Sequence, residues 1–327
     1  MIADQDLNHR TPIHKRKPEF SMLALTGCVS FSYTSHAAAS LQSVPSSSSC
    51  LQTSERLLGP LFPPSNRSRF DSAKDDILVS HEHKLFVCYI LKNAATEWIK
   101  LAFNLSQRVY DDDYWYHRTL HTQTLEPMGR NISSLSSVCS EDWARLVTLR
   151  EPHERLLSAY LDKCLASRET PCLNAMDLRL PVPAFVDWVR LLTPAQVLYA
   201  SNHHFMLQSE FCGINAGLMS SFYTTVLDMS DSKHFAPRVR RILSAHGLTN
   251  STMDEFFPLE RHDADDPHVS SAGTKLCSYY DRATWNIVTQ LYQVDVEMYE
   301  SLFGAERTSF ESMCSSTPNN QTREESH

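Results

Sequence analysis

Two segments of this chain combine an apolar run with polar residues that can bind an anion. The first, residues 84–103, reads KLFVCYILKNAATEWIKLAF, and the second, residues 145–163, reads RLVTLREPHERLLSAYLDK. Each begins with the apolar run of a buried parallel strand and passes through a polar turn into a helical pattern. Since a helix N-terminus presents free N–H groups and the positive end of the helix dipole, each junction suits a phosphate. The pair can therefore hold a ligand with two separate phosphates.

The first junction brings a lysine to the end of its strand. We expect a strand over residues 85–90, a turn over 92–96, and a helix after the turn. The ammonium of Lys92 can contact an anionic oxygen, and the small residues of the turn let the backbone approach a ligand closely. The alternative for Lys92 alone is a surface lysine after a strand. The candidate ligand-binding residues are Lys92, Asn93, Ala94, Ala95 and Thr96.

The second junction brings an arginine and a serine. A strand over residues 146–149 is followed by Arg150, and Pro152 suits the first turn of the next helix. Arg150 lies where open α/β sheets bind ligands, at the carboxyl end of a strand. Ser158 lies about two turns along the helix, within reach of the same anion. We expect Arg155 to face solvent or to pair with an acid.

Both segments resemble the donor-binding motifs of the Golgi carbohydrate sulfotransferases. Residues 84–103 resemble the family's 5′-phosphosulfate loop, although Leu91 stands where a proline usually precedes the lysine. The run Arg-x-Pro-x-x-Arg-x-x-Ser-Ala-Tyr that begins at Arg150 resembles the family's 3′-phosphate motif. The resemblance is strongest to the branch that sulfates chondroitin, dermatan and the human natural killer glycan epitope, and it covers about residues 84–304.

This resemblance implies a fold, a cofactor and a reaction. The fold is an α/β fold with a three-layer, mostly parallel sheet of P-loop-like topology. The cofactor is 3′-phosphoadenosine 5′-phosphosulfate (PAPS), with Lys92 and Thr96 on its 5′ side and Arg150 and Ser158 at its 3′-phosphate. The reaction moves a sulfuryl group to a hydroxyl of a glycan acceptor, and fixed cations and N–H groups stabilise the developing charge without a metal.

A third segment, residues 201–206, offers a general base. The family pairs a histidine with a tryptophan and has a cysteine eight positions after the histidine. His204 and Cys212 reproduce that register, and Phe205 stands where the family has tryptophan. The resemblance implies that His204 takes the proton of the acceptor hydroxyl, and an imidazole with a near-neutral pKa suits that task. His203 is the alternate base. One or both histidines could instead form hydrogen bonds in the core or bind the acceptor.

Two rival functions follow from the same residues. Leu91, Phe205 and Asn215, which replaces a family cysteine, favour a catalytically inactive glycan- or nucleotide-binding relative. Retention of both donor-binding and acceptor-side groups argues against that relative. A P-loop kinase is the second rival, and the absence of the G-x-x-x-x-G-K-[ST] pattern argues against it.

Composition limits the class of protein. The chain has 327 residues, of which 42% are hydrophobic, and a formal net charge of −8. An acidic balance argues against a nucleic-acid partner but leaves room for a local basic pocket. Without a leader and polar ends roughly 230 residues remain, which suits one α/β sulfotransferase domain over residues 81–305. Within it we expect a further core strand over 222–227 and an amphipathic stripe over 282–303.

The ends of the chain carry targeting and linker patterns. Residues 1–39 place a basic run before an uncharged stretch and three alanines, the order of a signal peptide or a weak membrane anchor. Residues 40–80 are rich in serine and proline, like a stem or linker, and 306–327 form a polar tail that we expect to be disordered. A disordered end without targeting value is the alternative for 1–39. The family resemblance implies a single-pass protein with a Golgi luminal domain.

Cysteines and glycosylation triplets agree with a secretory address. The chain has nine cysteines and five Asn-x-Ser/Thr triplets. We expect one or two disulfides, with a buried thiol as the alternative for Cys88 in its apolar strand.

Overall fold

The computed structural model describes residues 77–105, 138–166, 182–194, 197, 203–215, 217–259 and 271–314. All of these residues belong to one compact unit, Ala37–His327. The predicted leader at 1–39, most of the predicted stem, and residues 315–327 lie outside the described residues, so the proposed domain boundaries stay predictions.

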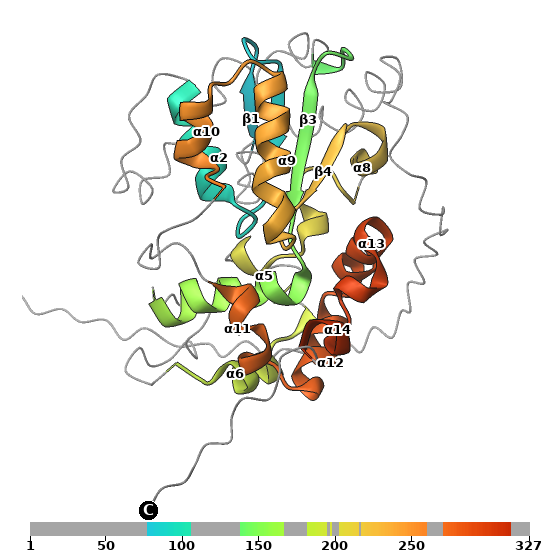
Figure 1. The fold of residues 1–327 in the computed structure, drawn as a ribbon. Helices are drawn as coiled ribbons and strands as arrows, with labels where there is room; N and C mark the ends of the chain where they lie inside the picture. Colours follow the sequence, from blue (N-terminus) through green and yellow to red (C-terminus); the bar gives the residue numbers. More distant parts are fainter. Residues whose placement is uncertain are drawn as a thin grey trace, which may run out of the picture. The chain divides into compact units, whose positions relative to one another are not determined.

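A four-stranded sheet with the order β1-β2-β3-β4 forms the centre of the fold (Figure 1). β1 (Ile77–Ser80) pairs antiparallel with β2 (Leu85–Cys88), whereas β2, β3 (Ala144–Leu149) and β4 (Thr225–Asp228) run parallel. Every residue of β2 and β3 is buried, as the continuous apolar runs require of strands covered on both faces. The mostly parallel α/β fold predicted from the sequence is confirmed.

Two strand boundaries differ from the expected ones. β2 ends at Cys88, and β4 starts only at Thr225, after Phe222 and Tyr223. The ring of Phe222 instead packs edge-on against Phe86, with ring centroids 4.9 Å apart. An apolar run indicates which residues are buried, and buried residues extend beyond those that pair with a neighbouring strand. The apolar pattern alone therefore predicts both strands longer than they are.

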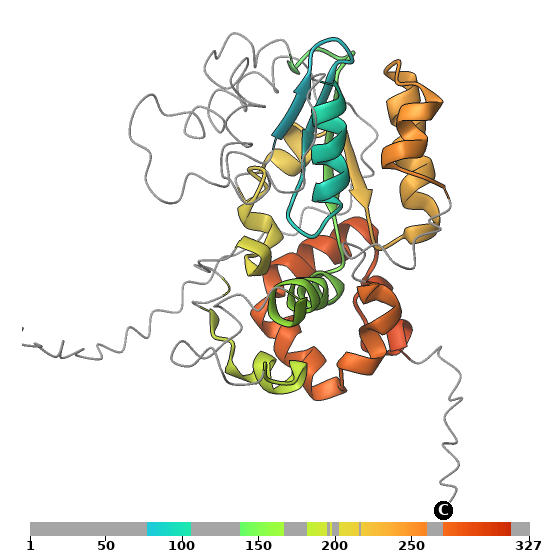
Figure 2. The same ribbon diagram turned by 90° about the vertical axis from the view of Figure 1, so that its left-hand side faces the viewer.

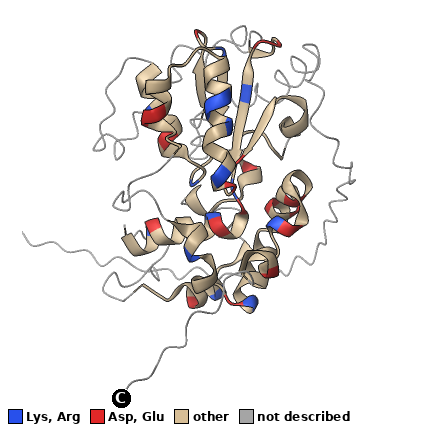
Figure 3. Ribbon diagram, in the orientation of Figure 1, with Lys and Arg blue, Asp and Glu red and all other residues tan. Residues whose placement is uncertain are grey.

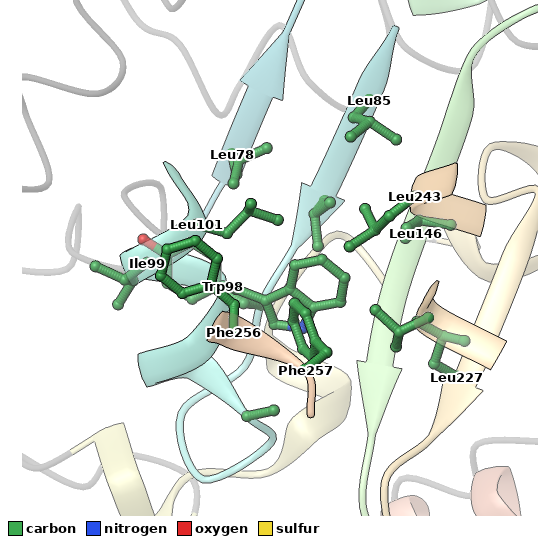
Figure 4. Close-up of a cluster of buried hydrophobic side chains, with 14 of the residues drawn as sticks. Leu78, Leu85, Trp98, Ile99, Leu101, Leu146, Leu227, Leu243, Phe256 and Phe257 are labelled. Atoms are coloured by element: carbon green, nitrogen blue, oxygen red, sulfur yellow. The ribbon is translucent and has the colours of Figure 1, made fainter. Parts of the chain in front are cut away.

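Helices cover both faces of the sheet. On one face, α2 (Ala95–Leu105), α9 (Ser232–Ala245) and α10 (Asn250–Phe256) pack on alternate strand residues in one apolar cluster. Figure 4 shows Trp98 of α2 beside Phe257 in this cluster. The intervening strand residues point to the other face, where α8 (Leu218–Ser221) and α13 (Gln293–Phe303) cover them. The result is the predicted three-layer arrangement.

A third group of helices lies beyond the carboxyl ends of β3 and β4 (Figures 1 and 2). These helices share a separate apolar cluster with many aromatic residues. The predicted stripe over residues 282–303 is divided between two helices at Tyr292, whose hydroxyl donates to the carbonyl oxygen of Phe205 at 2.6 Å. The group consists of α5 (Pro152–Ala159), the π-helix η3 (Tyr160–Ala166), α6 (Phe185–Leu191), α11 (Ala272–Tyr279), α12 (Arg282–Leu291) and α14 (Phe310–Cys314).

Disulfides are more numerous than the one or two that we expected. Cys88 bonds to Cys212, so Cys88 is not a free buried thiol, and Cys277 bonds to Cys314. Cys139 and Cys164 are disulfide-bonded as well. The Cys277 bridge fixes α14, which lies within the range assigned to a polar tail, so the first part of that range is helical.

Candidate active site

The two junctions predicted to bind anions meet at the carboxyl edge of the sheet. The guanidinium of Arg150 donates through Nη1 to the carbonyl oxygen of Lys92 at 3.0 Å. The Asn93 side chain donates through Nδ2 to the carbonyl oxygen of Thr148, at the end of β3, at 2.9 Å. Because β2 and β3 are adjacent parallel strands, their carboxyl ends bring both turns to the same place.

The turn between β2 and α2 has an unusual backbone. Lys92 and Ala94 both adopt left-handed conformations, with φ of 71° and 60°. Non-glycine residues in this region carry strain and mark functional sites when the surroundings hold them there. Here the buried Asn93 between them anchors the turn to β3, and α2 begins directly afterwards at Ala95. Thr96 therefore lies in the first turn of α2, where backbone N–H groups are free of helical partners.

The Lys92 side chain points toward the π-helix. Its Nζ lies 2.7 Å from Oδ2 of Asp162, and only 14% of the side chain is exposed. Burial lowers the pKa of Lys92, and the Asp162 carboxylate opposes that shift. Burial disfavours ionisation of Asp162 too, but the neighbouring ammonium groups of Lys92 and Lys163 hold the pKa of Asp162 below its ordinary value. The two side chains form an ion pair.

Arg150 is buried at the start of the second junction. Its Nη2 donates to Oε1 of Glu154 at 2.6 Å, while its Nε is buried and has no hydrogen-bond partner among the described residues. Glu154 and Ser158 are four residues apart on α5, so they share a face of that helix. Arg150, Glu154 and the buried Ser158 thus line one side of α5, which carries both acidic and basic residues (Figure 3). A buried donor without a partner fits an anionic ligand.

Arg155 was expected to face solvent or to pair with an acid, and the structure shows otherwise. Only 1% of Arg155 is exposed, because every residue of α5 is buried among neighbouring elements. Its Nε donates to the carbonyl oxygen of Leu91 at 3.0 Å, and its Nη1 donates to that of Met206 at 2.6 Å. A contact of 3.5 Å joins Nη2 to the carbonyl oxygen of His203. Arg155 therefore fastens the histidine segment to the lysine turn.

Gln208 is a second connector that the sequence did not single out. Its Oε1 accepts from Nδ2 of Asn93 at 2.6 Å and from the backbone N–H of Arg150 at 3.0 Å. Its Nε2 donates to the carbonyl oxygen of Arg150 at 2.8 Å. The backbone N–H groups of Gln208 and Ser209 donate to the buried carboxylate of Asp295. One side chain thus holds both junctions, and its own backbone is fixed by α13.

The histidines lie on a short 3-10 helix, His203–Phe205. Burial lowers the pKa of His204 well below its ordinary value, and the cations Lys163 and Lys92 lower it further. The carboxylate of Asp162 acts in the opposite direction and raises the pKa of His204. Burial also lowers the pKa of His203. At neutral pH His204 is an uncharged imidazole, which is the form that accepts a proton.

Comparison with known proteins places the chain in a family. A sequence model described as the sulfotransferase family matches residues 75–301. The chain belongs to the sulfotransferase family. No curated protein and no solved structure matches it. The family match covers both junctions and the histidine segment, and it agrees with a transferase that moves sulfuryl groups.

The sulfotransferase structure brings together most of the residues that the sequence nominated. Lys92, Asn93 and Arg150 meet at the carboxyl edge of the sheet. Arg155 joins the segment that carries His204 to the same turn, and Ser158 lies on α5. In the part of the chain that the structure describes, no group of three or more His, Cys, Asp or Glu side chains could hold a metal ion. No helix among the described residues combines the length and apolarity needed to cross a membrane.

Proposed function

We propose that this sulfotransferase transfers a sulfuryl group from PAPS to a hydroxyl of a glycan. The observation that carries the proposal is the 3.0 Å hydrogen bond from Arg150 to the carbonyl oxygen of Lys92. It joins two junctions that each suit a phosphate, as a donor with separate 5′ and 3′ phosphate groups requires. The resemblance of both segments to carbohydrate sulfotransferases supports the glycan acceptor and the chondroitin, dermatan and natural killer epitope branch.

The chain's own residues divide the donor between them. Lys92, Thr96 and the backbone N–H groups at the start of α2 would hold the 5′ side, since they combine positive charge with backbone donors. Arg150 and Ser158 would hold the 3′-phosphate. The Nε of Arg150, which has no hydrogen-bond partner among the described residues, fits that anion. When bound, PAPS supplies the sulfuryl group.

His204 would remove the acceptor proton. Sulfuryl transfer requires the attacking hydroxyl to lose its proton, and a ring nitrogen of neutral His204 can accept it. Arg155 and Gln208 keep the segment that carries His204 beside the lysine turn, and this arrangement supports His204 as a base close to the proposed donor site. His203 remains the alternate base on the same turn.

A Golgi luminal address forms part of the proposal. Six described cysteines are disulfide-bonded, and such bonds persist in oxidising compartments. The order of charged, uncharged and small residues in 1–39 supports entry into the secretory pathway by a cleaved signal or a single-pass anchor.

One observation favours the alternative of a catalytically inactive relative. The carboxylate of Asp162 lies 2.7 Å from the ammonium of Lys92, so an acidic side chain already balances the positive charge of the lysine in this structure. A protein that keeps this pair permanently would bind nucleotide or glycan without turnover. The side chains of Lys92 and Asp162 are 14% and 32% exposed, so an anionic ligand could reach the ammonium and replace the carboxylate.

The test is a transfer assay with the full chain purified from a secretory host. PAPS labelled in its sulfuryl group is incubated with a panel of glycans, and the products are identified by mass spectrometry. Label that moves to a glycan with wild-type protein, and does not move with Arg150→Ala, supports the proposal. Binding of donor and glycan without transfer would instead establish the inactive relative. Absence of both binding and transfer would contradict the proposed donor.

A further inference from the structure

Asp162 lies between two lysine ammonium groups beside the candidate site. Its Oδ2 is 2.7 Å from Nζ of Lys92 and 3.6 Å from Nζ of Lys163. All three side chains are largely shielded, with 14%, 18% and 32% exposed for Lys92, Lys163 and Asp162. Shielding from water makes the electrostatic interactions among these charges stronger than they would be on the surface. Two cations thus share one carboxylate where the proposed donor would bring further negative charge.

The backbone that presents Asp162 is a π-helix. The α-helical hydrogen-bond pattern of α5 changes at Tyr160, and η3 continues from Tyr160 to Ala166. Tyr160 is itself fixed, because its hydroxyl donates to the carbonyl oxygen of Pro183 at 2.5 Å. π-helical segments are rare and occur frequently at functional sites. Here η3 carries Asp162 and Lys163 to the side chain of Lys92, which lies in the turn before α2.

The same carboxylate acts on the candidate base. Charged groups from three elements act electrostatically on the His204 imidazole: Lys92 from the turn before α2, Arg155 from α5, and Asp162 and Lys163 from η3. The three cations favour the neutral imidazole, and Asp162 alone favours the protonated form. While Lys92 is paired with Asp162, the ammonium offsets much of the negative charge that the carboxylate would otherwise present to His204.

We propose that Asp162 is a positioning residue, which holds Lys92 when no donor is bound and turns its charge toward His204 when an anionic donor group takes Lys92. This inference rests on the proposed function. The 5′ phosphate and sulfate oxygens of a donor would compete with Asp162 for the lysine, and their negative charge would repel the carboxylate. Released from Lys92, the carboxylate stabilises the imidazolium that forms when His204 accepts the acceptor's proton. Donor binding thereby makes His204 a stronger base.

The proposal predicts opposite effects on donor binding and on turnover. In Asp162→Asn the lysine has no competing carboxylate, so adenosine 3′,5′-bisphosphate should bind about three- to tenfold more tightly. The turnover number should fall, because the imidazolium of His204 loses the stabilising negative charge of Asp162. The acid limb of the kcat–pH profile should move to lower pH by about one unit, the usual size of one neighbouring charge.

Calorimetry with adenosine 3′,5′-bisphosphate and pH-dependent turnover with PAPS test this directly. Asp187→Asn is the matched control, since that carboxylate on α6 pairs with Arg190 at 3.4 Å and is 67% exposed. It should change neither measurement. A purely structural role for Asp162 would weaken both binding and turnover without moving the acid limb, and that result would overturn the inference.

The two proposals fail in distinguishable ways. If the wild-type protein binds the bisphosphate but Asp162→Asn binds it no more tightly, the proposed donor survives and the role of Asp162 is rejected. If the wild-type protein does not bind the bisphosphate at all, the proposed function is rejected, and the inference with it. A circular-dichroism melt of each variant establishes that the folded protein is being compared.

Discussion

The guanidinium of Arg155 donates to the carbonyl oxygen of Leu91 at 3.0 Å, just before the lysine turn. The same group reaches the carbonyl oxygen of Met206, just after the candidate base. A buried charge of this kind is stable only when hydrogen bonds compensate its loss of water, and three carbonyl oxygens do so here. The proposed donor-side and acceptor-side segments, which are far apart in sequence, are therefore both held by the side chain of Arg155.

Arg155→Lys should destabilise the fold and disable the site together. A lysine keeps the charge but cannot reach three carbonyl oxygens in a planar fork, so buried acceptors lose their donor. We expect a loss of about 2–4 kcal/mol in the free energy of unfolding, measured by urea denaturation, and a large loss of transfer activity.

Arg190→Lys on α6 is the control for Arg155. That arginine is 54% exposed and its partner Asp187 is 67% exposed, so the pair should contribute less than about 1 kcal/mol. Equal stability of the two variants would mean that the carbonyl contacts of Arg155 contribute little to the fold.

Donor recognition gives a second prediction. Because Arg150 and Ser158 resemble a 3′-phosphate site, the protein should bind adenosine 3′,5′-bisphosphate far better than AMP. Arg150→Ala should remove a charge-assisted contact of about 1.5–3 kcal/mol, or roughly ten- to a hundredfold in affinity by calorimetry. Equal affinity of the wild-type protein for bisphosphate and AMP would contradict this assignment.

The buried partner of Arg150 calls for a second variant. Arg150→Ala leaves the carboxylate of Glu154 without its 2.6 Å contact, which by itself destabilises the site. The double variant Arg150→Ala with Glu154→Gln removes that unpaired charge. If the double variant regains bisphosphate affinity, Arg150 acts on the fold and not on the donor.

Contiguous patterns in the sequence predict much of this site. Lys92 and Arg150 each follow an apolar strand directly, and parallel strands bring their carboxyl ends together whatever the chain does between them. The fold class follows from the same strand–helix order. The strand ends and the fold class depend on local sequence patterns, so they can be predicted from a single sequence.

The connecting residues could not be found in this way. Arg155 lies in the matched motif, yet its burial depends on α5 being enclosed by elements distant in sequence. Gln208 has no local signature, because its partners Asn93 and Arg150 belong to other segments. The shift of α5 into a π-helix, which presents Asp162, also leaves no mark in helical periodicity. Tertiary packing decides all three.

A third prediction concerns entry into the secretory pathway. Residues 1–39 fused to a reporter should route it into that pathway, because a basic run precedes an uncharged stretch and three alanines. Glycosylation and secretion of the reporter measure the outcome. A fusion in which residues 14–17 are replaced by serines is the control for the basic run, and a wild-type fusion that stays cytosolic and unglycosylated would refute the prediction.

The last prediction concerns the base. If His204 accepts the acceptor's proton, His204→Ala should lower kcat by about 10²–10⁴-fold, the usual contribution of general-base catalysis. Bisphosphate affinity should change little, because the donor contacts lie on the two junctions. His203→Ala is the matched control and should be milder. If His204→Ala retains turnover and His203→Ala does not, the base is His203. If both variants retain turnover, the base does not lie in this segment.

The pH dependence of the same reaction follows from the charges around His204. Activity requires the neutral imidazole, so it should fall as the pH drops through the pKa of His204. Burial, Lys163 and Lys92 lower that pKa in the donor-free protein, so the acid limb of kcat/KM should lie below the ordinary histidine value of about 6.5. Lys163→Gln removes one of these cations and should move that limb to higher pH. A limb that stays in place in Lys163→Gln would mean that the titrating group is not His204.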